Sequence, residues 1–188
     1  MDRTDGLAAH LLIATPAMAD PRFARAVIYL CAHTPEGAMG LIVNKPAPDV
    51  DFSDLLDQLG IEHGQDAAAI RVRFGGPVEL GRGFVLHSTD YPGTHGTMRI
   101  DDDTAMSATT EILESMAGGR GPEHSLFALG YAGWGPGQLD EEIAQNAWLV
   151  ATPQREIVFD GNDDSKWTRA LATLGIDPLL LSPVQGRA

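Results

Sequence analysis

Short runs of apolar residues recur along the chain and predict β-strands. Unbroken apolar runs of about four to eight residues are typical of strands that are covered on both faces. The predicted strands are residues 10–15, 26–33, 40–44, 83–88, 125–131, 147–152 and 156–159. In residues 97–101 apolar and polar positions alternate instead, so we expect a half-exposed or edge strand there.

Apolar positions three and four residues apart predict four helices. One helix starts at residue 52 and ends at Gly60, with apolar positions 52, 55, 56 and 59 on one face and aspartates on another. The others are residues 109–117, about 139–147 and about 164–174. Residues 60–70 and 88–96 are predicted loops. Because strands and helices do not alternate regularly, the pattern favours a mixed α+β fold over a doubly wound sheet.

The charge balance narrows the range of partners. The chain has 188 residues, enough for one domain, and carries 26 acidic against 13 basic residues, a net charge of −13. Nucleic acids and anionic membranes both attract basic surfaces, so direct contact with either is disfavoured. No apolar run approaches the length of a membrane helix, which is about 20 residues. The single cysteine, Cys31, rules out an internal disulfide, and its apolar neighbours indicate a buried, inert thiol. We therefore expect a cytoplasmic protein.

The glycine-rich segment at residues 130–138 is the most suggestive local motif. It lies between a predicted strand and a predicted helix, where backbone N–H groups could hold a phosphate. The acidic residues that follow, 140–142, already complement the helix dipole and would repel an anion. Gln138, Glu142 and Asn146 are spaced four apart and form a polar row that either lines a pocket or faces solvent. Trp134 either packs over the turn or takes part in binding.

The other candidate motifs are weaker. Gly75 and Gly76 precede a proline and indicate a turn, or a place where the backbone closely approaches a ligand. Six scattered histidines, with no metal-binding spacing, predict neither a metal site nor a cofactor. The aspartates at residues 101–103 fit a solvated turn better than a cation site. No serine has the surroundings of a nucleophile.

Several blocks in order resemble the YqgE/AlgH family of bacterial proteins. These blocks are residues 12–18, 20–23, 27–33, 37–46, 74–78, 82–87 and 130–138, followed by Glu142, Asn146 and Trp148. The resemblance covers residues 10–184. It implies a single domain over residues 1–188 with a branched, partly barrel-like sheet surrounded by helices, in a bacterial cytoplasm. The family has no established biochemical function, although part of its name reflects a proposed role in transcriptional regulation.

The resemblance selects positions but gives none of them a catalytic role. The candidate ligand-binding residues are Asn44, Gly75, Gly76, His87, Trp134, Gln138, Glu142 and Asn146. Ala26 stands where similar sequences usually carry Ser or Thr, so a hydroxyl nucleophile at that position is absent.

Three functions compete on this basis. A noncatalytic module that binds a protein or a small neutral or cationic ligand ranks first. A regulator of transcription that acts indirectly, through protein partners, ranks second, because the chain has no basic helix for DNA. A hydrolase or transferase that uses His33 or His87 with Glu142 or a nearby aspartate ranks third, so the sequence leans away from an enzyme.

Overall fold

A nine-stranded sheet organises the computed structural model, which describes residues 6–93 and 95–181. The strand order is β6-β7-β5-β8-β3-β2-β1-β9, and the short β4 pairs with β8 off this path. Every pairing is antiparallel except the parallel one of β4 with β8. The strands are β1 Leu11–Ala14, β2 Val27–Thr34, β3 Gly37–Ile42, β4 Val72–Phe74, β5 Val78–Ser88, β6 Thr97–Arg99, β7 Thr104–Ser107, β8 Ser125–Trp134 and β9 Trp148–Ala151.

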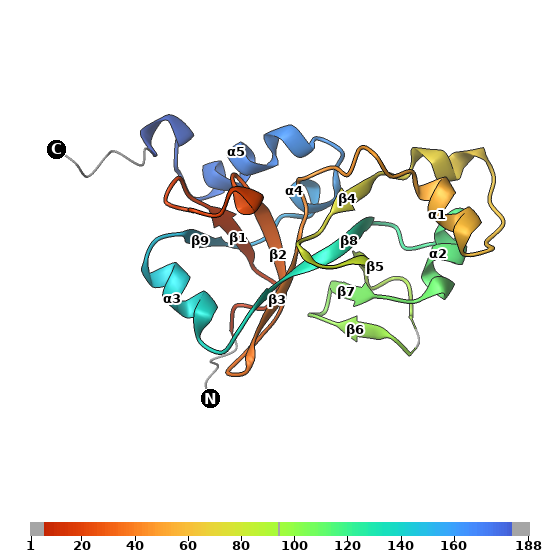
Figure 1. Ribbon diagram of the computed structural model, residues 1–188, viewed down its shortest axis with the longest axis horizontal. Helices are drawn as coiled ribbons and strands as arrows, with labels where there is room; N and C mark the ends of the chain where they lie inside the picture. Colours follow the sequence, from red (N-terminus) through yellow and green to blue (C-terminus); the bar gives the residue numbers. More distant parts are fainter. Residues whose placement is uncertain (1–5, 94, 182–188) are drawn as a thin grey trace.

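Strand β8 connects the two halves of this sheet. Along one edge it pairs with β5, and along the other it pairs first with β4 and then, at residues 132–134, with β3. Figure 1 shows β8 crossing between the group β1, β2, β3 and β9 and the group β4 to β7. The result is a curled, open half-barrel, which confirms the α+β class and the branched sheet.

Five α-helices in the described part of the chain lie on the outside of the sheet (Figure 1). They are α1 Phe52–Gln58, α2 Thr110–Ala117, α3 Gln138–Ala144, α4 Arg155–Phe159 and α5 Asp163–Thr173, with 3-10 turns at Pro21–Phe23, Gln65–Ala69 and Pro178–Leu180. Helix α5 packs on β1 and β2, α3 packs on β3 and β9, and α1 and α2 lie together on the other half. No helix within residues 6–93 or 95–181 is long and apolar enough to cross a membrane.

Three apolar clusters fill the spaces between the sheet and its helices. One lies beneath α5 and includes Trp167, a second lies beneath α3 and includes Trp134 and Trp148, and the third joins α1 and α2 to β5 and β8. Cys31 is 3% exposed, and burial raises the pKa of its thiol to about 12, so the expected buried, inert cysteine is found.

Most predicted elements are present, with bounds shifted by a few residues. Residues 97–101 contain β6, which lies at one edge of the sheet as predicted. The predicted strand at 156–159 is wrong, because these residues form helix α4. The backbone groups of α4 form hydrogen bonds within the helix, and Val158 N–H donates to the Gln154 carbonyl at 3.0 Å. The prediction failed because an apolar run this short fits one helical turn as well as a strand.

Further differences concern the half of the sheet that carries β5. Strands β4 and β7 are absent from the prediction, and β5 begins at Val78 rather than at residue 83. The predicted loop at 60–70 contains the 3-10 turn Gln65–Ala69.

Candidate functional site

Asn44 fastens the chain just before β2. Its Oδ1 accepts a hydrogen bond from Val27 N–H and its Nδ2 donates to the Arg25 carbonyl, both at 2.9 Å. The neighbouring Lys45 Nζ donates to the Ala24 carbonyl at 2.8 Å. Arg25 has a φ of 56°, a conformation that residues with a side chain rarely adopt. The two side chains therefore hold a strained turn in place.

Gly75 and Gly76 bring the chain against β8. A Cβ on Gly76 would lie 2.1 Å from the Tyr131 carbonyl carbon, and one on Gly75 would lie 2.4 Å from the Gly130 carbonyl oxygen. Gly75 N–H also donates to the Leu129 carbonyl at 2.8 Å, and its carbonyl accepts from Ile42 N–H at 2.9 Å. The two glycines thus permit close packing of the backbone of this chain on itself.

His87 lies inside the half of the sheet formed by β5 and β7 and is 0% exposed. One ring nitrogen, Nδ1, lies 2.9 Å from the Ser88 carbonyl, which can only accept, so Nδ1 carries the proton. The other, Nε2, then accepts from the Ser107 hydroxyl at 2.8 Å. Burial lowers the pKa of His87 and favours this neutral form. Both ring nitrogens are therefore engaged within the core.

Glu142 joins three elements around α3. Its Oε1 accepts from both indole nitrogens, Trp134 Nε1 at 3.0 Å and Trp148 Nε1 at 2.8 Å. Its Oε2 accepts from Gln138 Nε2 at 2.9 Å, and the side-chain oxygen Oε1 of Gln138 accepts from Gly135 N–H at 3.0 Å. The predicted pairing of positions 138 and 142 is therefore present, and it ties β8, α3 and β9 together.

Asn146 lies apart from that group. It has a φ of 64° and ends the turn after α3, where its carbonyl accepts from the Thr15 hydroxyl at 2.6 Å. Of the eight predicted residues, the structure brings together only Trp134, Gln138 and Glu142. The others lie elsewhere: after β3 (Asn44), after β4 against β8 (Gly75, Gly76), in the core next to β7 (His87) and after α3 (Asn146).

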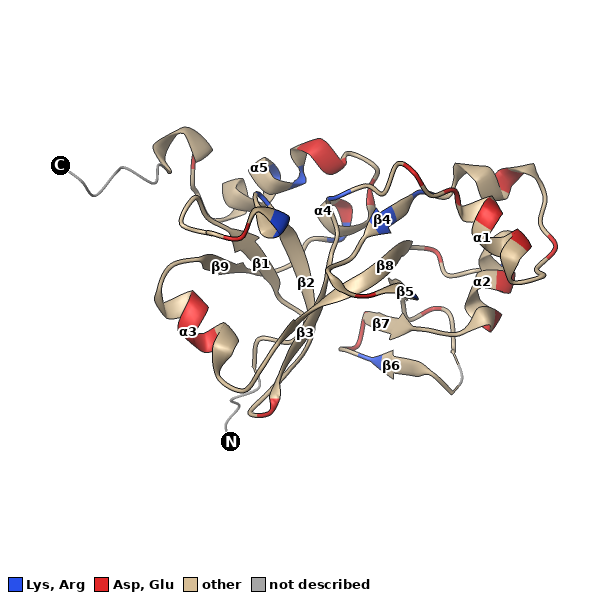
Figure 2. Cartoon of the chain, viewed as in Figure 1, with Lys and Arg blue, Asp and Glu red and all other residues tan. Residues whose placement is uncertain are grey.

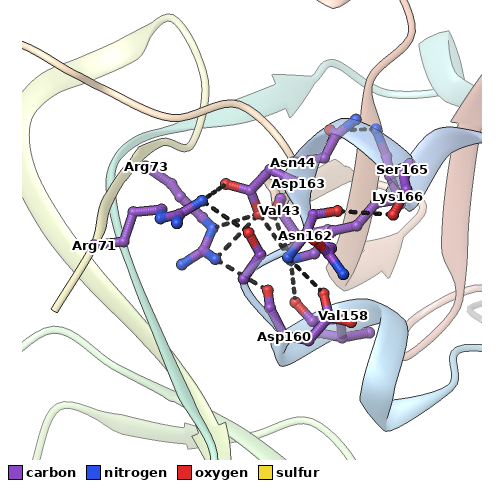
Figure 3. Close-up of polar contacts among 12 residues, drawn as sticks. Val43, Asn44, Arg71, Arg73, Val158, Asp160, Asn162, Asp163, Ser165 and Lys166 are labelled. Atoms are coloured by element: carbon purple, nitrogen blue, oxygen red, sulfur yellow. Dashed lines mark hydrogen bonds and ion pairs between the residues drawn. The ribbon is translucent and has the colours of Figure 1, made fainter. Parts of the chain in front are cut away.

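A buried charge cluster that the sequence reading missed lies beside Asn44 (Figure 3). Asp163, Lys166 and Arg73 are all buried. Lys166 Nζ lies 3.2 Å from Asp163 Oδ1 and donates to the carbonyls of Val43 at 3.0 Å and Val158 at 2.8 Å. Arg73 Nη2 bonds the same carboxylate oxygen at 3.1 Å. Burial, reinforced by the Arg73 charge, lowers the pKa of Lys166 to about 8.

The edge of this cluster reaches solvent. Arg71, whose side chain is half exposed, donates to Asp163 Oδ2 at 3.2 Å. Arg169 forms a two-pronged pair with Asp160 at 2.9 Å for each bond, and these hydrogen bonds hold the pKa of Asp160 below its ordinary value. The only signal in the sequence was the three-residue spacing of Asp163 and Lys166 on one helix. Arg71 and Arg73 come from about 90 residues earlier in the chain and could not be assigned to it.

Charge is unevenly distributed over the molecule. Figure 2 shows Lys and Arg gathered around α5, α4, β4 and the turn before β2. Helices α1, α2 and α3 carry acidic residues and no basic ones. Acidic residues lie among them, and Asp160 and Asp163 pair with four of these basic groups, so this end of the molecule carries both signs of charge.

A hollow of about 610 Å³, the hairpin hollow, lies where the β2–β3 hairpin and β5 flank the end of β8. Its walls include Glu36, Met39, Glu79, Phe84, Tyr131 and Trp134. At the rim of the hairpin hollow, β5 forms a bulge. Its residues 79–82 lie opposite a single residue of β8, Gly130. Within the bulge, Glu79 has a φ of 51°, Leu80 is 54% exposed, and Arg82 Nη1 pairs with Glu79 at 3.5 Å.

The aspartates at residues 101–103 form a tight turn. Asp101 Oδ1 accepts from the N–H groups of Asp103 at 2.9 Å and Thr104 at 2.8 Å. Among the residues that the structure describes, no group of three or more His, Cys, Asp and Glu side chains is arranged to hold a metal ion.

Comparison with known proteins gives consistent matches over nearly the whole chain. A family model described as AlgH-like matches residues 11–179. A UPF0301 protein of Paracoccus denitrificans is 56% identical over 190 residues and all of both chains. A UPF0301 protein of Cereibacter sphaeroides is 52% identical over 97% of this chain and 99% of the relative.

Two solved structures share the fold. The solution structure of the AlgH protein from Pseudomonas aeruginosa is 38% identical, with a TM-score of 0.80 over 100% of this chain and 98% of that one. The crystal structure of a Corynebacterium diphtheriae protein, DIP2367, is 21% identical, with a TM-score of 0.71 over 91% and 88% of the two chains.

Proposed function

The chain belongs to the AlgH-like family of bacterial proteins, and we propose that residues 1–188 form one noncatalytic binding module of the cytoplasm. Its hairpin hollow docks a basic segment of a partner protein. The observation that carries this proposal is the β5 bulge, which holds Val78 and Leu80 out of the core next to a hollow with aromatic walls. Apolar side chains displayed beside such a hollow are a common feature of protein interaction sites.

Backbone strain at the bulge supports a binding role. Glu79 adopts a left-handed conformation that costs roughly 1 kcal/mol for a residue with a Cβ. Gly130, opposite it, has a φ of 76°, and a Cβ there would lie 2.3 Å from the Gly76 carbonyl oxygen. Strained backbone that the surrounding structure holds in place is a frequent property of ligand clamps.

Charge determines the kind of partner. Glu36 and Glu79 lie at the rim, and the positive charge of Arg82 there is already paired with Glu79. The net charge of −13 adds a long-range field that attracts a basic partner and repels an acidic one. A segment with Lys or Arg next to an apolar anchor matches both the rim and the hollow.

The geometry gives less support to a hydrolase or transferase that uses His87 or Glu142, although His33 Nε2 lies 3.3 Å from Asp140 Oδ1. His87 is engaged at both ring nitrogens inside the core, and the Glu142 carboxylate accepts three N–H bonds. Neither group is free to move a proton to or from a substrate in this arrangement. An indirect role in regulation needs a protein partner and is compatible with the docking site.

Photo-crosslinking in living bacteria tests the proposal. A photoreactive amino acid replaces Leu80 in one strain and Met98, an exposed residue of the edge strand β6, in a control strain. We expect a partner that crosslinks from position 80 and not from position 98. The crosslinked segment, made as a peptide, should contain Lys or Arg and bind less tightly as salt increases.

Two variants then test whether this peptide binds in the hairpin hollow. Leu80→Ser and the double variant Glu36→Lys/Glu79→Lys should each weaken the peptide at least about tenfold, a loss of about 1.4 kcal/mol. Equal crosslinking from both positions, an acidic peptide, or binding that neither variant changes would contradict the proposal.

A further inference from the structure

Arg25 combines an unusual backbone with an unusual side-chain position. Its φ of 56° is one that glycine adopts far more readily. Its guanidinium carbon lies 5.0 Å from the centre of the Trp167 ring. Among the described residues, nothing accepts a hydrogen bond from this guanidinium and no carboxylate pairs with it. The chain therefore presents an available cation from a strained turn.

The surroundings hold Arg25 firmly. Asn44 bonds the carbonyl of Arg25 and the N–H of Val27, while Lys45 bonds the carbonyl of Ala24. The platform beneath the guanidinium is equally fixed, because Trp167 is 8% exposed and its Nε1 donates to the Ala14 carbonyl at 2.8 Å. A guanidinium stacked on an indole keeps its N–H groups free at the edge, where they can bind a carboxylate in two-pronged fashion.

A groove of about 490 Å³ begins at this point, and we call it the Arg25 groove. Its other walls are mostly apolar and include Pro16, Met18, Trp167, Pro178 and Leu179. Of the residues that the structure describes, Arg25 is the only charged one that lines it. The groove is open at one wall, because Leu179 is 88% exposed.

We propose that the Arg25 groove docks a segment of a partner protein in which a large apolar side chain stands next to a carboxylate. Charge complementarity carries this choice: the groove has apolar walls and one cation, Arg25, which has no carboxylate partner among the described residues. The 88% exposure of Leu179, although it lines the groove, favours a polypeptide over a small acid, since a small ligand held at Arg25 would leave most of this side chain uncovered. This site lies away from the hairpin hollow, and the proposal does not depend on the function assigned to that hollow.

An unbiased peptide selection tests the proposal. Random twelve-residue peptides on phage are selected on the immobilised full-length chain, and the enriched sequences are made as labelled peptides for anisotropy titration. We expect a consensus with Asp or Glu adjacent to Leu, Ile, Phe or Trp. Changing that acid to its amide should weaken binding at least about tenfold, the loss of one charge-assisted contact.

Arg25→Gly is the informative variant because the left-handed backbone favours glycine, so the turn is retained while the guanidinium is removed. It should weaken the selected peptides at least about tenfold. If Arg25 pairs directly with the acid of the peptide, reversing both charges should restore binding. Arg25→Glu should therefore bind a peptide in which that acid is changed to Lys more tightly than it binds the original peptide. The matched control is Arg22→Gly, since Arg22 lies on the neighbouring 3-10 turn and pairs with Asp20 at 2.7 Å. This control should change the affinity less than about twofold.

Several outcomes would overturn the proposal. They are a selection without a consensus, a consensus without an acidic residue, and peptides that bind Arg25→Gly as well as the unaltered chain. An octanoate concentration series is the final arm. Binding of octanoate as tight as that of the peptide, with full displacement of the peptide, would show that the groove is a site for small carboxylic acids instead.

Discussion

The Nζ atom of Lys166 lies 3.2 Å from Oδ1 of Asp163, and the two side chains are 0% and 3% exposed. A buried ion pair contributes little net stability when both partners are present, because both charges lose their hydration. Removing one partner is costly, since the other charge stays buried without compensation. This pair also connects α5 to β3 through the Val43 carbonyl and to α4 through the Val158 carbonyl.

We predict that Asp163→Ala lowers the free energy of unfolding by about 3–5 kcal/mol, because it leaves Arg73 and Lys166 facing one another without a carboxylate. Urea denaturation followed by tryptophan fluorescence measures the loss. Asp164→Ala is the control, since Asp164 is the exposed neighbour on the same helix and should cost less than about 1 kcal/mol. Equal losses in the two variants would show that the cluster has no special role.

The lowered pKa of Lys166 predicts a pH dependence of stability. The ammonium form is disfavoured in the folded chain, which releases its proton near pH 8, whereas the unfolded chain holds it to about pH 10.4. Between these values the unfolded state binds more protons, so this residue makes the folded state more stable as pH rises. Tyr29 and Cys31 act in the opposite direction, because burial raises their pKa values and the unfolded chain ionises first.

Because these groups have opposite effects, the contribution of Lys166 to the pH dependence of stability is measured by comparing the unaltered chain with a variant that lacks this lysine. The unfolding free energy of the unaltered chain minus that of Lys166→Met should increase by more than about 1 kcal/mol from pH 7.5 to pH 10. A titration of the Lys166 side-chain carbon signals by NMR provides an independent check. A midpoint near that of an exposed lysine, or a difference that stays constant with pH, would contradict the prediction.

We predict that Glu142→Ala destabilises the chain by about 2 kcal/mol, because the indole N–H groups of Trp134 and Trp148 both lose their acceptor. Near-ultraviolet circular dichroism should show the change in the environment of the two rings. Glu142→Gln should retain part of the stability, since its amide oxygen can still accept. Glu141→Ala changes an exposed neighbour and should leave the spectrum unaltered; the same spectral change in both would disprove the role of Glu142.

Gly76 and Gly60 both have a positive φ but differ in the space around the position of a Cβ, so substitutions at the two sites can be compared directly. Gly76→Ala should cost at least about 3 kcal/mol or prevent folding, since the new Cβ would meet the Tyr131 backbone. Gly60 has a φ of 72° but nothing within 4 Å of its Cβ position, so Gly60→Ala should cost only about 1 kcal/mol. Thermal unfolding compares them, and similar losses would mean that close packing on β8 is unimportant.

Local sequence patterns predicted the fold class and most elements because apolar runs and helical spacing are properties of neighbouring residues. They misassigned residues 156–159, since one short apolar run fits a helical turn as well as a strand. They missed the three-residue strand β4, and they missed β7, whose four residues pair with both β5 and β6 but carry no distinctive pattern.

The site was less accessible to sequence reasoning. The contact between Gln138 and Glu142 could be read from their spacing, whereas the two tryptophans that complete the arrangement come from β8 and β9. The Arg73–Asp163 contact spans 90 residues, and Arg25 and Trp167 are even further apart in the chain. Such contacts depend on the packed fold and have no local signature.

The position of β8 sets an order of events during synthesis. Both halves of the sheet need this strand, and β1 lacks its outer neighbour until β9 has been made. While the ribosome produces the first 124 residues, β3 and β5 therefore have an unpaired edge each. Loop closure over such separations is slow, and exposed strand edges attract other chains. A nascent chain of this protein must therefore stay shielded from aggregation until about two thirds of it has been translated, and only then can both halves fold together.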